Sequence, residues 1–483
     1  MKNILLLIMI GIAAVSCDSF LDEPIEKSSA KSLETAEELD AVIEGLPFLY
    51  PSETDFFCTD NFTIPIDFYS DLPTSFDINM EQQYVMTPFT ENSGDIIWNL
   101  HYETIWTCNL AIKSINEGEL KGDKVLLSKL KAEAHFIRAM SYFSLVLNYC
   151  LHPSTQNENE LGLPLRTNTD GEENLTRSGL KETYEFIESD LAEALKADIE
   201  FTRNWRISTV AVKAFAARYY LYVGQFDLAS VYADEALTEY SDMIDYATEF
   251  PTVEMFDAEY PISFEYSQNR NDSRSLAFWK GQYYNRFKAN FRENTIPSQE
   301  LIDLFNPLDK RYELFMVEGY FKRFGGSGDL PLGYVQGAGG ACISGPSTAE
   351  MYLIRAEAKA RNNDIAGAAA DVEQVRMHRF ATADYVAMDV PTDKKSAIEM
   401  VIDERRREMP FTSRWYDIRR LNADAETDDI VIRRSFYPVS MGSANTNAEL
   451  MDYVIEANSR LFARPLASGI INLSNGQTKQ NEY

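Results

Sequence analysis

Glycine and proline are scarce in this sequence, with 23 and 18 of 483 residues. Both counts fall below average usage, which excludes a collagen-like, low-complexity or turn-dominated chain. Hydrophobic residues make up 45% of the chain and charged residues 25%. This balance is typical of an ordered globular protein that is long enough to bury a large apolar core.

Positive charge is in deficit, because 45 lysines and arginines face 75 aspartates and glutamates, a formal net charge of −30. The acidic residues are spread along the chain and do not gather in a tail. A field of this sign repels phosphate backbones and anionic lipid headgroups. Nucleic-acid binding and electrostatic docking to a membrane are therefore not expected, whereas a neutral or cationic ligand suits the field.

Cysteine is also rare, with five residues in the chain. Cys58, Cys108, Cys150 and Cys342 lie far apart, with neither a CxxC motif nor the spacing of a zinc site. Cys108 and Cys150 fall in helix-like segments, where a cysteine often serves as a small buried hydrophobe. The sequence leaves the disulfide state of these four residues open.

Sequence signatures of enzymes are missing. The four histidines form no HExxH motif, no GxSxG elbow occurs, and the glycine-rich stretch 325–345 lacks the GK[ST] of a phosphate-binding loop. The charged run 404–408 places Glu and Arg three residues apart, which favours ion pairs on a helix surface over a catalytic role. The two carboxylates of a glycosidase could still be hidden among so many acids. A glycoside hydrolase stays open as a distant alternative to a non-enzymatic protein, and no cofactor or metal is predicted.

Long hydrophobic runs are absent except for Ile4–Val15 near the start. Twelve residues are too few to cross a bilayer core of about 30 Å, but they suit the core of a signal peptide. The run ends in Ala14-Val15-Ser16-Cys17, which resembles a bacterial lipoprotein box with Ala in place of the usual first Leu. We therefore predict a lipoprotein signal peptide over residues 1–16 and a lipid anchor on Cys17. The alternative is an ordinary secretory peptide with an incidental cysteine.

Residues 17–32 are mostly polar and predict a tether between the lipid and the folded domain. Helical patterns then begin, with apolar residues three and four positions apart. The first four such segments are Leu33–Leu46, Ile96–Ile115, Leu126–Tyr149 and Leu180–Leu195. The third is apolar almost all round over 132–149, which predicts a buried helix.

Two further segments each predict a pair of closely packed helices. In the first, Val210–Val223 and Phe226–Leu237 flank Gly224, and in the second, 349–376, the turn lies at 362–364. Both alternate small and large residues as tetratricopeptide repeats do. Because the two copies lie about 140 residues apart, they predict a helical scaffold with large insertions and no continuous solenoid.

The insertions fall at about 50–95 and 243–343, and both are rich in aromatic residues without a regular period. Loops inserted between repeats commonly form the binding face. Helix returns at Ser396–Met409, whereas 423–483 predicts loops and short strands. We expect residues 33–483 to form one domain.

Six segments, in order, resemble the SusD/RagB family of outer-membrane nutrient-binding lipoproteins. They are CDSFLDEP (17–24), WNLHYETIWTCNLAIKSI (98–115), AEAHFIRAMSYFSLVLNY (132–149), AEMYLIRAEAKAR (349–361), ERRREMPFTSRWYDIRR (404–420) and the ending QNEY (480–483). The ending is shorter than the family's usual Gln-Asn-Pro-Gly-Tyr. The resemblance covers nearly the whole chain.

The resemblance implies an all-α, SusD-like fold, in which tetratricopeptide-like helix pairs form the scaffold and a large, irregular, loop-rich lobe binds the ligand. It implies a non-enzymatic lipoprotein of the outer membrane that faces the cell exterior. Such a protein captures oligosaccharides and delivers them to a SusC-like TonB-dependent transporter. The alternative is the same architecture binding peptides or another nutrient, as on the RagB side of the family.

A glycan-binding surface needs flat apolar faces beside hydrogen-bonding groups, and Trp and Tyr on loops supply both. The first candidate platform is Trp279 with Tyr283 and Tyr284, flanked by the polar residues Gln282, Asn285 and Arg286. Tyr69 and Tyr84 form a second candidate wall, with Asp67, Asp71 and Asn79 nearby. For each single aromatic the alternative is packing in the core. Trp98, Trp106 and Trp415 lie in scaffold motifs and are expected in the core, whereas Trp205 is left open.

Overall fold

The computed structural model describes residues 33–47, 49, 55–69, 72, 76, 78–86, 95–169, 175–249, 280–286, 288–290, 295–334, 341–440 and 444–483. The predicted signal peptide, Cys17 and Trp279 lie outside these residues. Within them, every helix is too short or too polar to cross a membrane.

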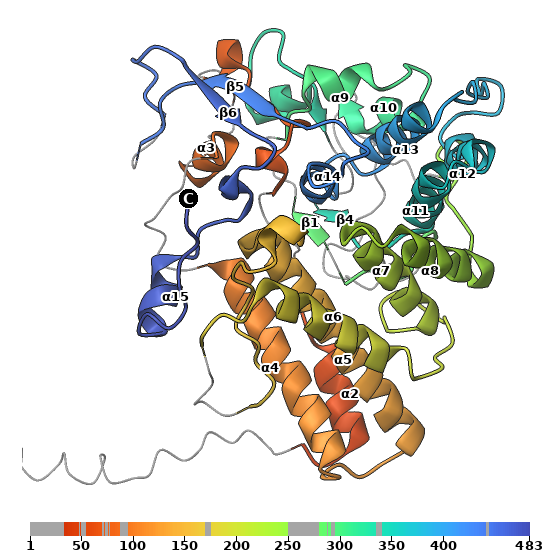
Figure 1. Ribbon diagram of the computed structural model, residues 1–483. Coiled ribbons are helices and arrows are strands. Elements are labelled where there is room, and N and C mark those ends of the chain that lie inside the picture. Colours follow the sequence, from red (N-terminus) through yellow and green to blue (C-terminus); the bar gives the residue numbers. More distant parts are fainter. Residues whose placement is uncertain are drawn as a thin grey trace, which may run out of the picture.

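Helices dominate the described chain (Figure 1). The longer ones are α2 (Ala36–Glu44), α4 (Ile96–Asn116), α5 (Lys124–Tyr149), α6 (Leu180–Ala194), α7 (Thr209–Tyr222), α8 (Phe226–Glu239), α11 (Thr348–Arg361), α12 (Ile365–Met377), α13 (Lys394–Glu408) and α14 (Arg414–Leu421). Short α-helices are α3 (Ile78–Tyr84), α9 (Gln299–Asp303), α10 (Lys310–Phe315) and α15 (Ser468–Leu473). The 3-10 turns are η1 (Asp55–Cys58), η2 (Ile66–Phe68), η3 (Thr155–Asn157), η5 (Tyr320–Phe324) and η7 (Arg460–Phe462).

Side-chain caps fix where several of the long helices begin. The Asp95 side chain accepts from the backbone N–H of Trp98 at the start of α4, at 3.1 Å. Ser208 and Ser347 accept in the same way at the starts of α7 and α11, each at 3.2 Å. Each cap satisfies a backbone donor that the first helical turn leaves free.

Successive helices pack as antiparallel neighbours: α4 with α5, α5 with α6, α7 with α8, and α11 with α12. In each of the two helix pairs predicted from small-and-large alternation, the turn contains a residue with a left-handed backbone conformation. These residues are Gly224 (φ 75°) and Asn363 (φ 62°). Helices α8 and α11 also pack together. The helices on either side of the insertion are thus neighbours in the scaffold.

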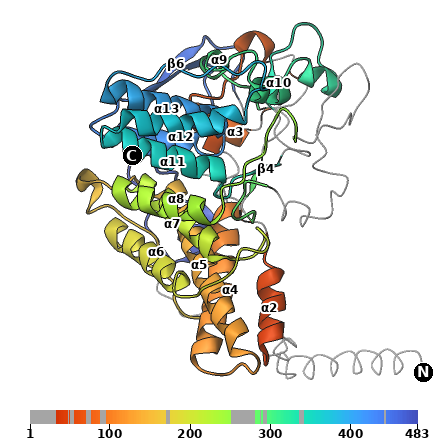
Figure 2. The same cartoon turned by 90° about the vertical axis from the view of Figure 1, so that its right-hand side faces the viewer.

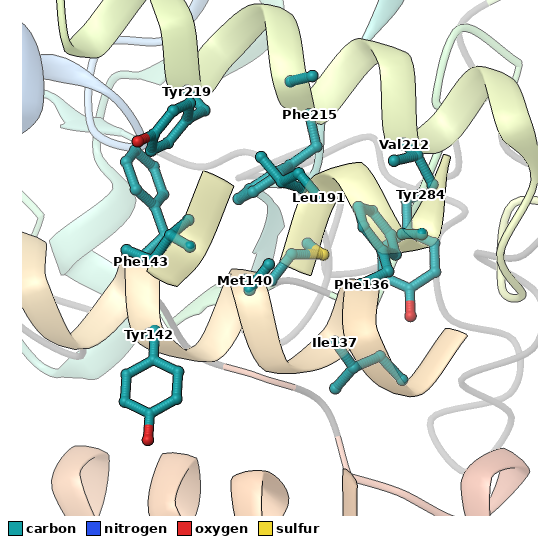
Figure 3. Packing of buried hydrophobic residues seen from close by; sticks show 14 of the residues in the cluster. Phe136, Ile137, Met140, Tyr142, Phe143, Leu191, Val212, Phe215, Tyr219 and Tyr284 are labelled. Carbon is teal, nitrogen blue, oxygen red and sulfur yellow. The ribbon is translucent and has the colours of Figure 1, made fainter. Parts of the chain in front are cut away.

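The scaffold core forms around α5, which is buried over most of its length. Figure 3 shows Phe136, Met140 and Phe143 pointing from α5 toward α7, while Tyr142 points to the other side. Phe215 of α7 forms T-shaped ring contacts with Phe136 and Phe143, at centroid distances of 5.7 and 5.5 Å. A helix apolar all round is stable only when neighbours cover it on every side, as they do here.

Strands are few and short in the described chain. Three two-stranded antiparallel sheets pair β1 (Lys288–Asn290) with β4 (Ala341–Ile343), β2 (Met316–Val317) with β3 (Gly333–Tyr334), and β5 (Ile432–Phe436) with β6 (Met451–Ile455). Figures 1 and 2 show β5, β6, α3, α9 and α10 at the end of the molecule opposite the turn between α4 and α5. We call this end the lobe, and its core is a separate apolar cluster of residues from 56–85, 244, 296–334, 411, 436 and 444.

The expected fold is confirmed: the protein is mostly helical and SusD-like, with paired helices and few strands. Trp98 and Trp415 lie in the core as expected, and Trp205 joins them at 6% exposure. The expectation for Trp106 is wrong, because its side chain on α4 is 47% exposed. Its indole N–H donates to the Thr169 carbonyl at 3.4 Å, and α4 buries its other face.

The charged run 404–408 forms structural ion pairs, but these pairs do not lie on an exposed helix surface. Glu404 and Arg405 are 0% and 4% exposed. Glu404 pairs with Arg407 as the spacing predicts, at 2.8 Å, whereas Arg405 reaches Asp417 on α14 at 2.9 Å. These ion pairs join α13 to the helices around it.

Candidate functional site

Half-buried aromatic side chains gather on the lobe, and Tyr69 is the predicted site residue among them. Tyr69 follows η2 and keeps part of its ring accessible. The ring stacks on Phe76 at a centroid distance of 6.0 Å and an interplanar angle of 18°, and meets the edge of Phe436 at 5.3 Å. The neighbouring rings leave the accessible part of Tyr69 as a fixed apolar surface.

Glu81 on α3 sets the orientation of Tyr69. The Tyr69 hydroxyl donates to one Glu81 carboxylate oxygen, and the other oxygen accepts from the Ala444 backbone N–H at 2.7 Å. Partial burial and the adjacent Glu81 carboxylate raise the pKa of Tyr69 above its usual value. The hydroxyl therefore stays protonated and donating at neutral pH.

Tyr84 does not form the second half of this wall, contrary to the sequence-based expectation. It is 4% exposed, with the Arg434 guanidinium 4.1 Å from its ring centroid and Phe436 edge-on at 5.3 Å. Arg434 also donates to the carbonyls of Phe57 and Thr59 at 2.8 and 2.6 Å. Tyr84 is thus part of the lobe core, and its ring offers no face to a ligand here.

Tyr283 and Tyr284 are likewise buried, both at 0% exposure. The Tyr283 hydroxyl donates to the Tyr240 carbonyl at 2.7 Å. Tyr284 packs edge-to-face on Phe136 in the scaffold core at 5.1 Å, as Figure 3 shows. The stacking role expected for these two residues does not fit the structure, because a sugar ring needs an accessible face.

The polar residues beside them are structural as well. Arg286 is 1% exposed, lies 4.7 Å from the Trp205 ring centroid and donates to the Glu44 carbonyl at 3.1 Å. The Asn285 backbone N–H donates to the Asn204 carbonyl at 2.7 Å. The segment 281–286 therefore runs through the interior and ties α2, the 204–205 turn and the scaffold core together.

Two tyrosines beside Tyr69 were missed by the sequence reading. Tyr437 follows β5 and Tyr453 lies on β6, and both are partly exposed. The ring centroids of Tyr69 and Tyr437 are 5.9 Å apart, and the Tyr453 hydroxyl donates to the Tyr437 carbonyl at 3.4 Å. We call Tyr69, Tyr437 and Tyr453 the tyrosine patch.

The signal that could have found the patch was weak. Tyr437 and Tyr453 follow or occupy short alternating stretches, SFYPVS and MDYVIE. Such a pattern predicts a strand but not its position beside a loop almost 370 residues earlier.

Metal ligands do not cluster in the described part of the chain, where no group of three His, Cys, Asp or Glu side chains could hold an ion. Cys58, Cys108 and Cys150 are buried thiols. Burial raises the pKa of Cys108 to about 12, so its thiol is neither a metal ligand nor a nucleophile at neutral pH.

Two family models match the chain. Residues 19–221 match the model described as "Starch-binding associating with outer membrane", and residues 348–483 match the one described as "SusD family". No protein of curated function shows significant sequence similarity to the chain.

Solved structures share the fold at low sequence identity. A SusD superfamily protein from Bacteroides thetaiotaomicron is 19% identical, with a TM-score of 0.65, over 93% of this chain and 100% of the other. A SusD-like carbohydrate binding protein from Bacteroides vulgatus is 17% identical, with a TM-score of 0.61, over 92% and 98%. A SusD superfamily protein from Parabacteroides distasonis is 18% identical, with a TM-score of 0.59, over 93% and 99%.

Proposed function

Because the chain belongs to the SusD/RagB family, we propose that it is a cell-surface glycan-binding lipoprotein. SusD family proteins bind their ligands without enzymatic turnover. The observation that carries the proposal is the match of residues 19–221 to a model described as starch-binding and outer-membrane associated. One structural relative is also described as a carbohydrate binding protein.

The ligand contacts that we propose are the tyrosine patch and Trp279. The patch has what an oligosaccharide needs: partly exposed rings held in place by neighbours, with hydroxyl groups at the edges. Trp279 directly precedes Lys280, which the structure describes. Stacking on a few rings gives weak, reversible capture, which suits a protein that must release its ligand again.

Delivery to a SusC-like TonB-dependent transporter and anchoring through lipid on Cys17 complete the proposal. The anchor rests on the sequence of residues 1–17. Several acyl chains on one cysteine hold a protein durably, whereas one chain binds only marginally. A Cys17→Ser variant should lose the membrane fraction and incorporate no labelled palmitate, and retention of both would contradict the anchor.

Calorimetric titration tests the ligand. The soluble chain that begins after Cys17 is titrated with a panel of plant and host polysaccharides and with a peptide digest. We expect saccharide binding that falls at least tenfold in Tyr69→Ala and in Trp279→Ala. The matched control is Tyr232→Ala, because Tyr232 is a partly exposed tyrosine stacked on Tyr220 at 5.5 Å in the scaffold.

The outcomes separate the alternatives. Saccharide binding that survives both site variants would keep the function and move the site elsewhere. Binding to peptides alone would favour the RagB-like alternative, and turnover of a bound oligosaccharide would contradict a non-enzymatic role.

A further inference from the structure

A cavity of about 50 Å³ lies where the scaffold meets the C-terminal helices. Its walls come from α5, α7, α13, α14 and the turn before α11, and α14 packs against α7 there (Figure 1). One side is apolar and includes Phe143, Leu147 and Phe215. The other side carries three arginines, Arg218, Arg405 and Arg420, and one acidic residue, Asp417.

Three residues in the cavity wall, Tyr222, Ser344 and Arg405, each have a buried hydrogen-bonding group without a partner within the described residues. The Arg405 side chain uses Nε on Asp417 and Nη2 on Glu350, which leaves Nη1 without a partner. The Ser344 hydroxyl is also without a partner. Arg405 and Ser344 are 4% and 7% exposed, so bulk water does not satisfy them. Orphaned donors at this depth usually mark a bound water or ion.

The charged residues that line or border the cavity balance one another. Arg218, Arg405 and Arg420 are balanced by three carboxylates, Glu350, Asp417 and Glu357. Each of these carboxylates pairs with two arginines. For Glu357 the second arginine is Arg361 of α11. Every carboxylate oxygen of this set faces an arginine and none is left over for the cavity.

Arg419 adds a further positive charge beside this set. It is 3% exposed, and among the described residues its side chain donates to the carbonyls of Leu147, which lines the cavity, and of Cys150. No acidic partner of Arg419 occurs in the described chain. The nearby His152 is uncharged at neutral pH, because burial lowers its pKa to about 3.

We propose that this cavity binds one small inorganic anion of the size of chloride, held by Arg405 Nη1 and the Ser344 hydroxyl. The volume excludes a sugar or a peptide, since a water molecule alone occupies about 10–15 Å³ by the same measure. Water could accept the same hydrogen bonds, but it would leave the surplus positive charge in place. The anion therefore acts as a structural link between the scaffold and the helices that carry the lobe.

Bromide exchange tests the site directly. Crystals of the mature protein grown in sodium bromide are measured at the bromine absorption edge. We expect one anomalous peak in the cavity, within hydrogen-bonding distance of Arg405 Nη1. Density without an anomalous signal would identify water and overturn the proposal, as would an empty cavity.

Thermal unfolding provides the second test, with sodium chloride compared with sodium gluconate at equal ionic strength. Gluconate is too large for the cavity, so only chloride should stabilise the fold by binding. A hundredfold rise in chloride should raise the melting temperature by roughly 2–4 °C beyond gluconate. The rise should shrink in Ser344→Ala, which keeps the packing, and persist in the exposed control Ser241→Ala. Equal melting temperatures in the two salts would contradict a tightly bound anion.

Discussion

The scaffold and the lobe hold their shapes in different ways. The scaffold consists of helices of 14 to 26 residues from α4 to α8, whose contacts join neighbours in the sequence. The lobe consists of helices of five to seven residues and strands of two to five, which cannot be stable alone.

Long-range polar contacts replace regular structure in the lobe. Arg434 donates to the carbonyl of Phe57 across 377 residues, and the Ala444 N–H reaches Glu81 across 363. Arg414 pairs with Asp60 at 2.7 Å in the same way. The lobe can therefore assemble only after its distant segments meet, whereas the scaffold can form from local contacts.

The largest expected effect is a loss of stability in the scaffold core. Phe136→Ala should lower the free energy of unfolding by about 3–5 kcal/mol, because a fully buried ring is replaced by a cavity. Chemical denaturation followed by circular dichroism measures the loss. The control is Val231→Ala on α8, where the side chain is 51% exposed and a change within about 0.5 kcal/mol is expected. Equal losses in both variants would refute the assigned core.

A change in the lobe should be smaller and local. Arg434→Met leaves the carbonyls of Phe57, Thr59 and Tyr84 without their buried donor, at a cost of about 2–4 kcal/mol. Hydrogen exchange should then speed up in the lobe and remain slow in α5.

The neighbouring Arg433 is exposed on the other face of β5 and provides the matched control. Arg433→Met should leave hydrogen exchange unchanged. Loss of protection in α5 of Arg434→Met would show that lobe and scaffold unfold as one unit.

Low pH should weaken the ion pairs between α13 and α14, which lie where the scaffold meets the C-terminal helices. Asp417 pairs with Arg405 and Arg420, and these guanidinium groups lower its pKa to about 2 despite the opposing effect of burial. A carboxylate whose pKa is lower in the folded than in the unfolded state stabilises the fold at pH values above its unfolded pKa of 3.8. This stabilisation is lost as the pH falls through 2.

The contribution is about 2 kcal/mol at neutral pH. Denaturant titrations of Asp417→Asn from pH 6 to pH 2 should show the largest difference from the natural protein at pH 6 and a shrinking one below pH 4. Asp428→Asn, at an exposed ion pair with Lys395, should follow the natural protein. A pH-independent difference for Asp417→Asn would contradict the assigned pKa.

The smallest expected effect concerns the hydrogen bond that orients Tyr69 in the tyrosine patch. Tyr69→Phe removes the hydroxyl that donates to Glu81, which should cost about 1 kcal/mol because the group is half-exposed. The ring remains, so glycan affinity should change far less than in Tyr69→Ala. Tyr232→Phe is the control in the scaffold. A loss of affinity equal to that of Tyr69→Ala would show that the hydroxyl, not the ring, contacts the ligand.

Sequence reasoning succeeded where structure is periodic. The predicted segments match α4 to α8 to within about two residues at each end, because burial repeats with the turn of the helix. Trp106 shows the limit of that reasoning: its position in a scaffold motif says nothing about which side of α4 a neighbour covers.

The candidate site was less predictable for a related reason. Tyr283 and Tyr284 lie in an aromatic-rich stretch without a period, where composition alone cannot separate a core residue from a ligand contact. Their burial depends on contacts with Tyr240 and Phe136, which are distant in the sequence. The sequence suggested Tyr69 as a candidate but not Tyr437, because only the folded lobe brings the two rings together.

The buried thiols make local opening measurable. Cys58 lies in the lobe, where its thiol donates to the Gln83 carbonyl at 3.4 Å, while Cys108 and Cys150 lie in the scaffold. A thiol reagent can react with each only during the moments when its surroundings open. In a Cys342→Ser background, the rate at which each sulfur is labelled therefore gives the opening frequency of its own region. The buried cysteines of this chain would therefore report how often the lobe opens compared with the scaffold.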